Sequence, residues 1–103
     1  MENQHRKIKG YRELSQAEID LMNEVKAKGV ELGELVEKIQ THLTEQVRLL
    51  QAAQVKPGGD NEAYLEVQRI REAESHRWAA IAKTDLQTGL MALTRSIAQP
   101  GFF

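Results

Sequence analysis

The chain lacks cysteine altogether and contains only two prolines among its 103 residues. Without cysteine it can form no disulfide, no thiolate metal site and no cysteine nucleophile, and its composition suits a reducing compartment. No apolar run reaches the ~18 residues that a membrane span needs. The polar start of the sequence also lacks the apolar stretch of a signal peptide. These absences favour one small soluble domain.

An excess of charge of one sign is also missing. The chain has 14 Lys and Arg against 15 Asp and Glu, a net charge of −1, whereas binders of long nucleic acid usually carry a basic excess. The charges are nevertheless unevenly placed. Residues 1–12 hold four bases and one acid, and residues 13–54 hold four bases and eight acids. We therefore expect a basic arm over residues 1–14 ahead of an acidic helical segment.

A capping box, Ser15-Gln-Ala-Glu18, predicts the start of a helix over residues 15–54. Apolar residues follow at alternating steps of three and four from Met22 to Leu43, and the pattern extends to Leu50 over about four heptads. A second apolar stripe flanks the first, so the apolar face is wider than a two-stranded seam needs. This flanking stripe consists of Leu21, Leu35 and Leu49.

Pro57-Gly-Gly59 breaks the helical pattern and predicts a turn over residues 55–59. A second helix is expected over residues 60–98, with Gly89 as a point where it could kink and Trp78 in the core. Two helices of similar length joined by a short turn predict an all-α domain over residues 15–103, built as an antiparallel long-helix hairpin. Two helices alone cannot cover such broad apolar faces, so we expect a helical homo-oligomer.

Gly29 and Gly33 form a small-xxx-small step on the first predicted helix. Such a step lets another helix approach closely, although each glycine costs about 1 kcal/mol of helix propensity. We therefore expect leucine at either position to force helices apart and disturb the assembly.

Aromatic residues are few, and three of the five lie near the ends of the chain, at Tyr11, Phe102 and Phe103. The hairpin register brings them together with Arg12 and Arg95 near the N-terminus of the first helix, where free N–H groups favour phosphate. Because aromatic rings stack on bases, at ~1–3 kcal/mol per base, this cluster suits a small anionic nucleotide. The alternative is that the rings staple helix ends and the cations are solvated.

Catalytic patterns are scarce. The three histidines lie far apart in the sequence without metal-ligand spacing, and neither a GxxxxGK[ST] loop nor a GxSxG elbow occurs. The numerous carboxylates are explained by ion pairs on helix surfaces. We therefore expect no metal, no cofactor and no enzymatic activity.

Two segments resemble the phage cyclic-nucleotide sponges, which are small helical-hairpin proteins that counter the bacterial CBASS defence. They are Lys9-Gly-Tyr-Arg-Glu-Leu-Ser-Gln-Ala-Glu-Ile19 with Met22-Asn-Glu-Val-Lys26, and Thr84-Asp-Leu-Gln-Thr-Gly-Leu-Met-Ala-Leu-Thr-Arg-Ser-Ile-Ala-Gln-Pro100 with Phe103. The resemblance covers roughly residues 9–33 and 72–103. The same hairpin domain occurs in sponges that capture cyclic ADP-ribose isomers in the Thoeris defence.

The resemblance implies a homohexamer in the cytoplasm of the infected bacterium that sequesters cyclic dinucleotides without cleaving them; some members of the family also bind cyclic trinucleotides at separate sites. It implies base stacking by Tyr11 and a phosphate contact by Lys26. Because the hairpin register separates these two by about 15 Å along the helix, we expect chains to share the pocket. The full cyclic-dinucleotide set is Tyr11, Arg12, Met22, Asn23, Lys26, Gln99, Pro100 and Phe103.

A cyclic-trinucleotide site on a three-fold axis needs one cation from each subunit, and Arg69 is the favoured candidate, followed by Arg71 and Lys28. Two other functions stay open. One is a sponge for cyclic ADP-ribose isomers, and the other is a purely structural coiled-coil adaptor with no nucleotide ligand. Neither a DNA or RNA polymer nor a membrane is expected as a partner.

Overall fold

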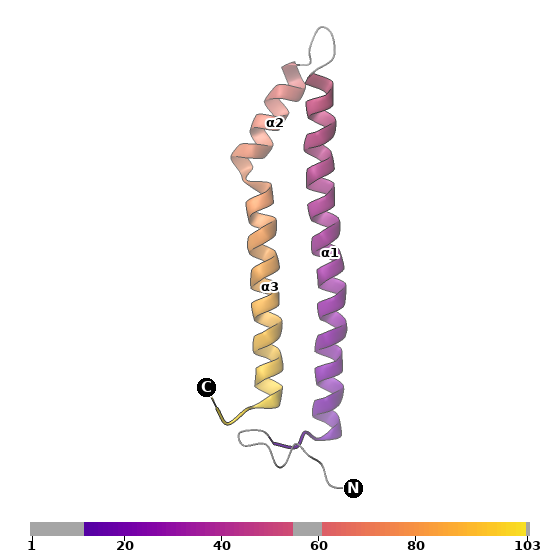
Figure 1. Cartoon of the computed structure of the whole chain (residues 1–103), viewed down its shortest axis with the longest axis vertical. Coiled ribbons are helices and arrows are strands. Elements are labelled where there is room, and N and C mark those ends of the chain that lie inside the picture. Colours follow the sequence, from indigo (N-terminus) through magenta and orange to yellow (C-terminus); the bar gives the residue numbers. More distant parts are fainter. Residues whose placement is uncertain (1–11, 55–60, 103) are drawn as a thin grey trace. The chain divides into compact units, whose positions relative to one another are not determined.

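The computed structural model describes residues 12–54 and 61–102, and every regular element in these ranges is a helix. In chain order they are α1 (Gln16–Gln54), α2 (Asn61–Ala73) and α3 (Ser75–Ala98) (Figure 1). The predicted all-α class is confirmed. The turn expected at 55–59 and the arm as far as Tyr11 lie outside the described residues, as does Phe103. Within the described ranges, no helix is long and apolar enough to cross a membrane.

α1 begins at the capping box that the sequence predicts. The Glu18 backbone N–H donates to Ser15 Oγ at 3.2 Å, and the Ser15 backbone N–H donates to Glu18 Oε1 at 2.8 Å. The first intrahelical bond runs from the Ile19 N–H to the Ser15 carbonyl at 2.9 Å. The reciprocal bonds satisfy two backbone donors that a helix start otherwise leaves without a partner.

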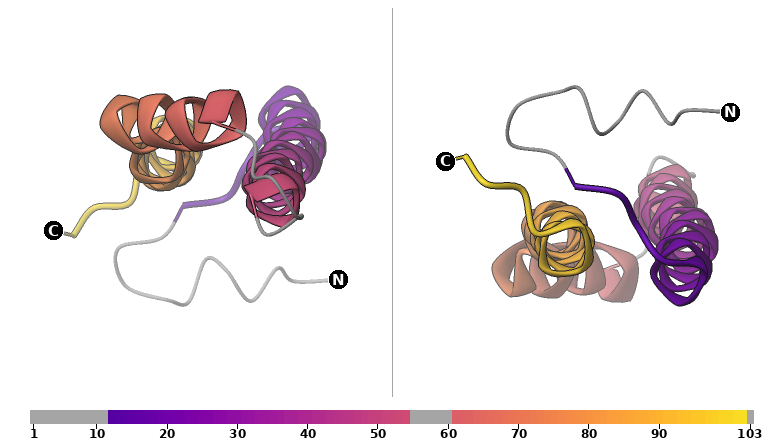
Figure 2. Two further views of the ribbon diagram at one scale, coloured as in Figure 1. Left: turned by 90° about the horizontal axis from the view of Figure 1, so that it is seen from above. Right: turned by 90° about the horizontal axis from the view of Figure 1, so that it is seen from below.

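The chain divides into two compact units, and α1 contributes to both. The first unit takes residues 1–32 and 85–103. In it, the start of α1 lies beside the end of α3 and the two helices run in opposite directions (Figures 1 and 2). The heptad residues Met22 and Val25 are half-buried here. A Cβ built on Gly29 would lie 3.5 Å from Leu90 Cδ1, so the heptad face of α1 packs on α3.

The second unit, Gly33–Thr84, holds the most deeply buried side chains of the described residues. They are Ala63, Val67 and Ile70, all on α2 and at helical spacings of four and three residues. This short helix therefore presents one apolar stripe to the interior of its unit.

Where a single helix over residues 60–98 was expected, the structure has two helices that meet at Glu74, while α3 runs through Gly89 without a break. Glu74 has φ 54°, in the left-handed region. Its N–H donates to the Arg71 carbonyl at 3.1 Å, and its own carbonyl accepts from the Trp78 N–H at 3.0 Å. Within the second unit, α2 consequently lies at an angle to the start of α3 (Figures 1 and 2).

Burial on α2 offsets the strain of this bend. A non-glycine residue in the left-handed region costs about 1–3 kcal/mol, whereas fully burying one Val or Ile side chain contributes about 1.5–3 kcal/mol. Val67 and Ile70 are both buried, so packing outweighs the local preference. Ala73 and Glu74 favour a helix, and for that reason the local sequence gives no sign of the bend.

Much of the apolar surface expected to pack stays exposed within the chain. The flanking leucines Leu21, Leu35 and Leu49 are 49%, 51% and 55% exposed. Trp78, expected in the core, is instead 58% exposed, and the Arg77 guanidinium lies 5.2 Å from the centre of its ring. The cation covers one face of the indole, which explains how Trp78 is accommodated at the surface.

Candidate functional site

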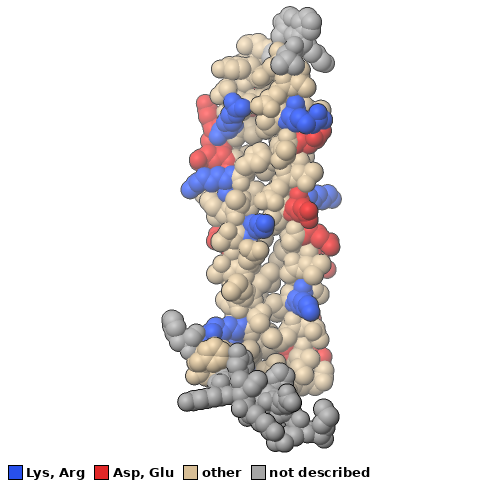
Figure 3. Space-filling view, viewed as in Figure 1, with Lys and Arg blue, Asp and Glu red and all other residues tan. Residues whose placement is uncertain are grey.

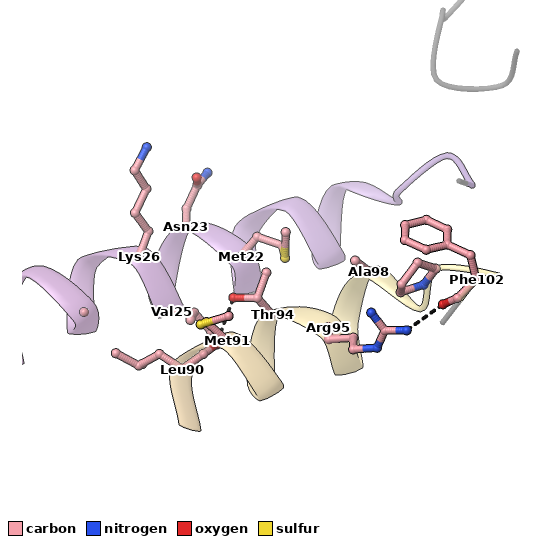
Figure 4. Close-up of a pocket in the computed structure, with 12 residues that line it drawn as sticks. Met22, Asn23, Val25, Lys26, Leu90, Met91, Thr94, Arg95, Ala98 and Phe102 are labelled. Atoms are coloured by element: carbon pink, nitrogen blue, oxygen red, sulfur yellow. Dashed lines mark hydrogen bonds between the residues drawn. The ribbon is translucent and has the colours of Figure 1, made fainter. Parts of the chain in front are cut away.

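An open groove of about 730 Å³ lies in the first unit, between the start of α1 and the end of α3 (Figure 4). Four residues of the predicted cyclic-dinucleotide set line it: Met22, Asn23, Lys26 and Pro100. Lys26 and Asn23 extend to the same side of α1 (Figure 4). Since residues three and four apart share one face of a helix, Met22 and Lys26 face the same groove.

The other helix contributes residues that the prediction did not place in the site. They lie on neighbouring rows of α3 and are Leu90, Met91, Thr94, Arg95 and Ala98. Val25 and Gly29 of α1 line the groove as well. The signal that could have found them is the spacing of Leu90, Thr94 and Ala98, which repeats every four residues opposite the heptad face of α1.

The C-terminal segment forms one end of the groove. Gln99 has φ 48°, and its N–H donates to the Arg95 carbonyl at 2.8 Å, which ends α3 in the left-handed conformation common at helix C-termini. Pro100 follows and cannot continue the helix. The chain therefore turns so that Pro100 and Phe102 line the groove, while the Gln99 side chain is exposed.

The groove carries positive charge on an apolar wall. Lys26 and Arg95 are among its described lining residues, which include no carboxylate. Arg95 Nη2 donates to the Phe102 carbonyl oxygen at 2.6 Å, and the Arg95 guanidinium lies 6.0 Å from the centre of the Phe102 ring (Figure 4). The protein as a whole has a net charge of −1, so this local cationic character is a property of the groove.

Arg12, also in the predicted set, bonds to protein groups. Its Nη1 donates to Glu18 Oε1 at 3.1 Å, and its Nη2 donates both to Glu18 Oε2 and to the Ile97 carbonyl oxygen, the latter at 2.7 Å. The Arg12–Glu18 pair thus joins the start of α1 to the last turn of α3. The predicted register placed Arg12 at this end of the hairpin, and the bond to Ile97 confirms it.

These bonds lower the pKa of Glu18 to about 2, chiefly because Arg12 donates to its carboxylate and next because the Ser15 backbone N–H does so. The ordinary value is 4.5. A carboxyl whose pKa is lower in the folded state stabilises the fold above the unfolded value, and that stabilisation is lost as the pH falls toward the folded value.

We therefore expect the melting temperatures of the unaltered protein and of a Glu18→Gln variant to differ by a constant amount above about pH 5. The difference should shrink as the pH falls from 4.5 toward 2, the interval between the two pKa values. Thermal melts followed by circular dichroism across this range measure it. A gap of constant size down to pH 2 would contradict the ion pair.

The three cations predicted for a cyclic-trinucleotide site do not all belong to one unit. Arg69 binds Glu66 through its guanidinium, with Nε 3.0 Å from each carboxylate oxygen. Lys28 pairs with Glu31 at 3.2 Å, and Arg71 lies in the last turn of α2, where its carbonyl accepts from the Glu74 N–H. Lys28 belongs to the first unit and both arginines belong to the second.

Two further predicted residues, Tyr11 and Phe103, lie outside the described residues. Across residues 12–54 and 61–102, no three His, Asp or Glu side chains gather in a way that could hold a metal ion. The described groove offers two cations, Lys26 and Arg95, and apolar contacts.

Comparison with known proteins gives the family that the two sequence segments resemble, and the match extends over nearly the whole chain. Residues 3–98 match the family model of the Acb2/Tad1 hairpin domain. Anti-CBASS protein 2 of Pseudomonas phage JBD67 is 50% identical over 105 residues, which cover 97% of each chain. With a matching family model and a relative of this similarity over nearly its full length, the chain belongs to the Acb2/Tad1 hairpin-domain family.

Proposed function

We propose that this protein is a phage immune-evasion protein that sequesters the cyclic dinucleotide signals of a bacterial host without cleaving them. One observation carries the proposal: the groove places Lys26 and Arg95 on an apolar wall that, among its described residues, has no carboxylate. The 50% identical relative is named an anti-CBASS protein, which supports the same role here. The protein acts in the cytoplasm of the infected cell, with residues 15–103 as its binding domain and residues 1–14 as a basic arm.

The dimensions and chemistry of the groove suit such a ligand. Small-molecule pockets typically have volumes of about 300–1,000 Å³, and this groove has about 730 Å³. A cyclic dinucleotide carries two phosphodiesters, which two cations can neutralise, and two bases that stack on aromatic or apolar side chains. Phe102, Met22 and Met91 provide such surfaces at the groove.

Sequestration also requires that the protein hold its ligand out of reach, and the groove of one chain is open. We propose that further copies of the chain close it in a homohexamer, using the exposed flanking stripe of Leu21, Leu35 and Leu49. Broad exposed apolar surface is typical of interfaces. Tyr11 of a neighbouring chain can then complete the pocket at Lys26.

Isothermal titration with cyclic dinucleotides, cyclic trinucleotides and cyclic ADP-ribose isomers tests the function. We expect at least one cyclic dinucleotide to bind more tightly than ~10 µM, about −7 kcal/mol, and to return intact from the heat-denatured complex. Absence of any such binding would leave a structural adaptor, preference for cyclic ADP-ribose isomers would move the protein to the other sponge class, and a linear product would show an enzyme.

We further propose that cyclic trinucleotides bind at a separate site that includes Arg69. Its ion pair with Glu66 is on the surface of α2, and surface pairs of this kind contribute little to stability, so Arg69 can exchange its partner for a phosphate. Arg69→Ala should weaken cyclic-trinucleotide binding about tenfold and leave cyclic dinucleotides unaffected in the same titrations. Equal loss of both ligands would contradict separate sites.

Polymeric nucleic acid fits this surface less well. On the face drawn in Figure 3, the Lys and Arg side chains lie interspersed with Asp and Glu along the helices. Proteins that bind DNA or RNA chains instead gather bases along one face. The mixed surface supports a small ligand held by local charges.

A further inference from the structure

The Arg12 guanidinium is largely occupied by protein groups, although the residue was predicted to contact nucleotide. Nη1 and Nη2 hold the two carboxylate oxygens of Glu18, and Nη2 also donates to the Ile97 carbonyl. Both N–H groups of Nη2 are thereby used, and the paired edge that an arginine offers to a carboxylate or phosphate is taken by Glu18. The arginine is suited to joining elements of the protein.

The elements joined are those that border the groove. Glu18 is in the first turn of α1, and Met22 of the groove lies one turn further along the same helix. Ile97 immediately precedes Ala98, from which the groove-lining segment continues through Pro100 to Phe102. We call the groove-lining segment Ala98–Phe102 the C-terminal wall. The bond from Arg12 to Ile97 therefore holds the start of this wall against the start of α1.

We propose that Arg12 and Glu18 act as a positioning pair for the proposed cyclic-dinucleotide site, fixing the C-terminal wall before the ligand arrives. This rests on the proposed function. Preorganised sites bind more tightly because less ordering remains to be done when the ligand enters.

Substitution of Glu18 changes the ligand affinity in opposite directions depending on whether Arg12 positions the C-terminal wall or contacts the ligand directly. Glu18→Gln retains the capping box, because glutamine serves at that position as well, but it removes the charge that holds Arg12. If Arg12 positions the wall, this variant binds cyclic di-GMP and cyclic GMP–AMP about tenfold more weakly. If Arg12 contacts phosphate, the variant frees the guanidinium, removes a nearby negative charge and binds more tightly.

Arg12→Lys provides the second arm. Lysine keeps the positive charge but lacks the planar fork that holds Glu18 and Ile97 together. If Arg12 positions the wall, Arg12→Lys should lose about tenfold in ligand affinity. If Arg12 makes a charge contact to phosphate, the lysine variant should retain most of that affinity. Amide hydrogen exchange adds a local readout without ligand: exchange at Ala98–Phe102 should quicken in both variants while α2 stays protected.

Arg48→Ala is a matched control, because Arg48 holds the Glu45 carboxylate through Nε at 2.9 Å and Nη2 at 2.5 Å, on a surface in the other unit. It should bind both probes as the unaltered protein does. All titrations are made well below the melting temperatures. If the unaltered protein binds the probes and both Glu18→Gln and Arg12→Lys bind them with the same affinity, the positioning role of the pair is overturned while the proposed function stands. Failure of the unaltered protein to bind overturns the proposed function, and the pair's role with it.

Discussion

Replacement of Lys26 by alanine is expected to weaken the binding of a cyclic dinucleotide by about 10- to 100-fold. The magnitude follows from the loss of one hydrogen bond between charged groups, which is worth about 1.5–3 kcal/mol. Lys26 is exposed on α1 and lines the groove, so its removal leaves no buried group without a partner. Isothermal titration measures the change, and the melting temperature should stay close to that of the unaltered protein.

The dependence of ligand affinity on salt concentration shows whether the affinity lost in Lys26→Ala is electrostatic. Because ions screen exposed charges, raising the ionic strength should weaken the unaltered protein far more than the Lys26→Ala variant. Lys38→Ala, a substitution of the same kind on the part of α1 that belongs to the second unit, should have no effect on affinity. Equal losses in both lysine variants would indicate a general charge effect and contradict a phosphate contact.

Placing glutamate at both Leu35 and Leu49 is expected to dissociate the proposed homo-oligomer into smaller species. Each leucine is about half exposed within the chain, so the substitutions cost little in an isolated molecule. In an interface they would bury unpaired carboxylates, whose effective penalty is several kcal/mol per ion. Light scattering coupled to gel filtration measures the mass, and circular dichroism should show retained helix.

Gly33→Leu examines self-association through a different face of α1, because residues two apart, such as Gly33 and Leu35, do not share a helix face. A Cβ at Gly33 would meet nothing within 4 Å among the described residues, so the first atom of the new side chain has room within the chain and we expect the clash to come from another copy. The variant should therefore lose assembly while keeping, or slightly raising, the stability of its helix, since glycine is a poor helix former. Unchanged mass in both Gly33→Leu and the double glutamate variant would contradict self-association through either face of α1.

The helical content was predictable because it depends on local patterns. Ser15 and Glu18 form the reciprocal bonds that the capping box implies, and the heptad residues Met22 and Val25 turn toward α3. The bend at Glu74 was not predictable, since its neighbours are helix formers and the compensation comes from burial of Val67 and Ile70. Such tertiary compensation has no signature in the residues at the bend.

For the groove, the sequence motifs indicated the α1 side and Pro100 but missed the contribution of α3. Thr94 and Ala98 are small side chains without distinctive chemistry, and only the pairing of the two helices turns them into a wall. Arg12 shows the reverse. Its charge suggested a phosphate ligand, whereas geometry directs its guanidinium to Glu18 and Ile97. Charge alone therefore could not assign its role.

The distribution of buried side chains has a consequence for how quickly a captured ligand escapes. All three deeply buried residues described above lie on α2, in the second unit, while the groove is in the first. Regions with few buried contacts open locally at lower free energy than the global unfolding of the protein. Ligand residence time should thus follow the opening of the α1–α3 end, and mutations that loosen this end would shorten the residence time of the ligand proportionally more than they lower the melting temperature.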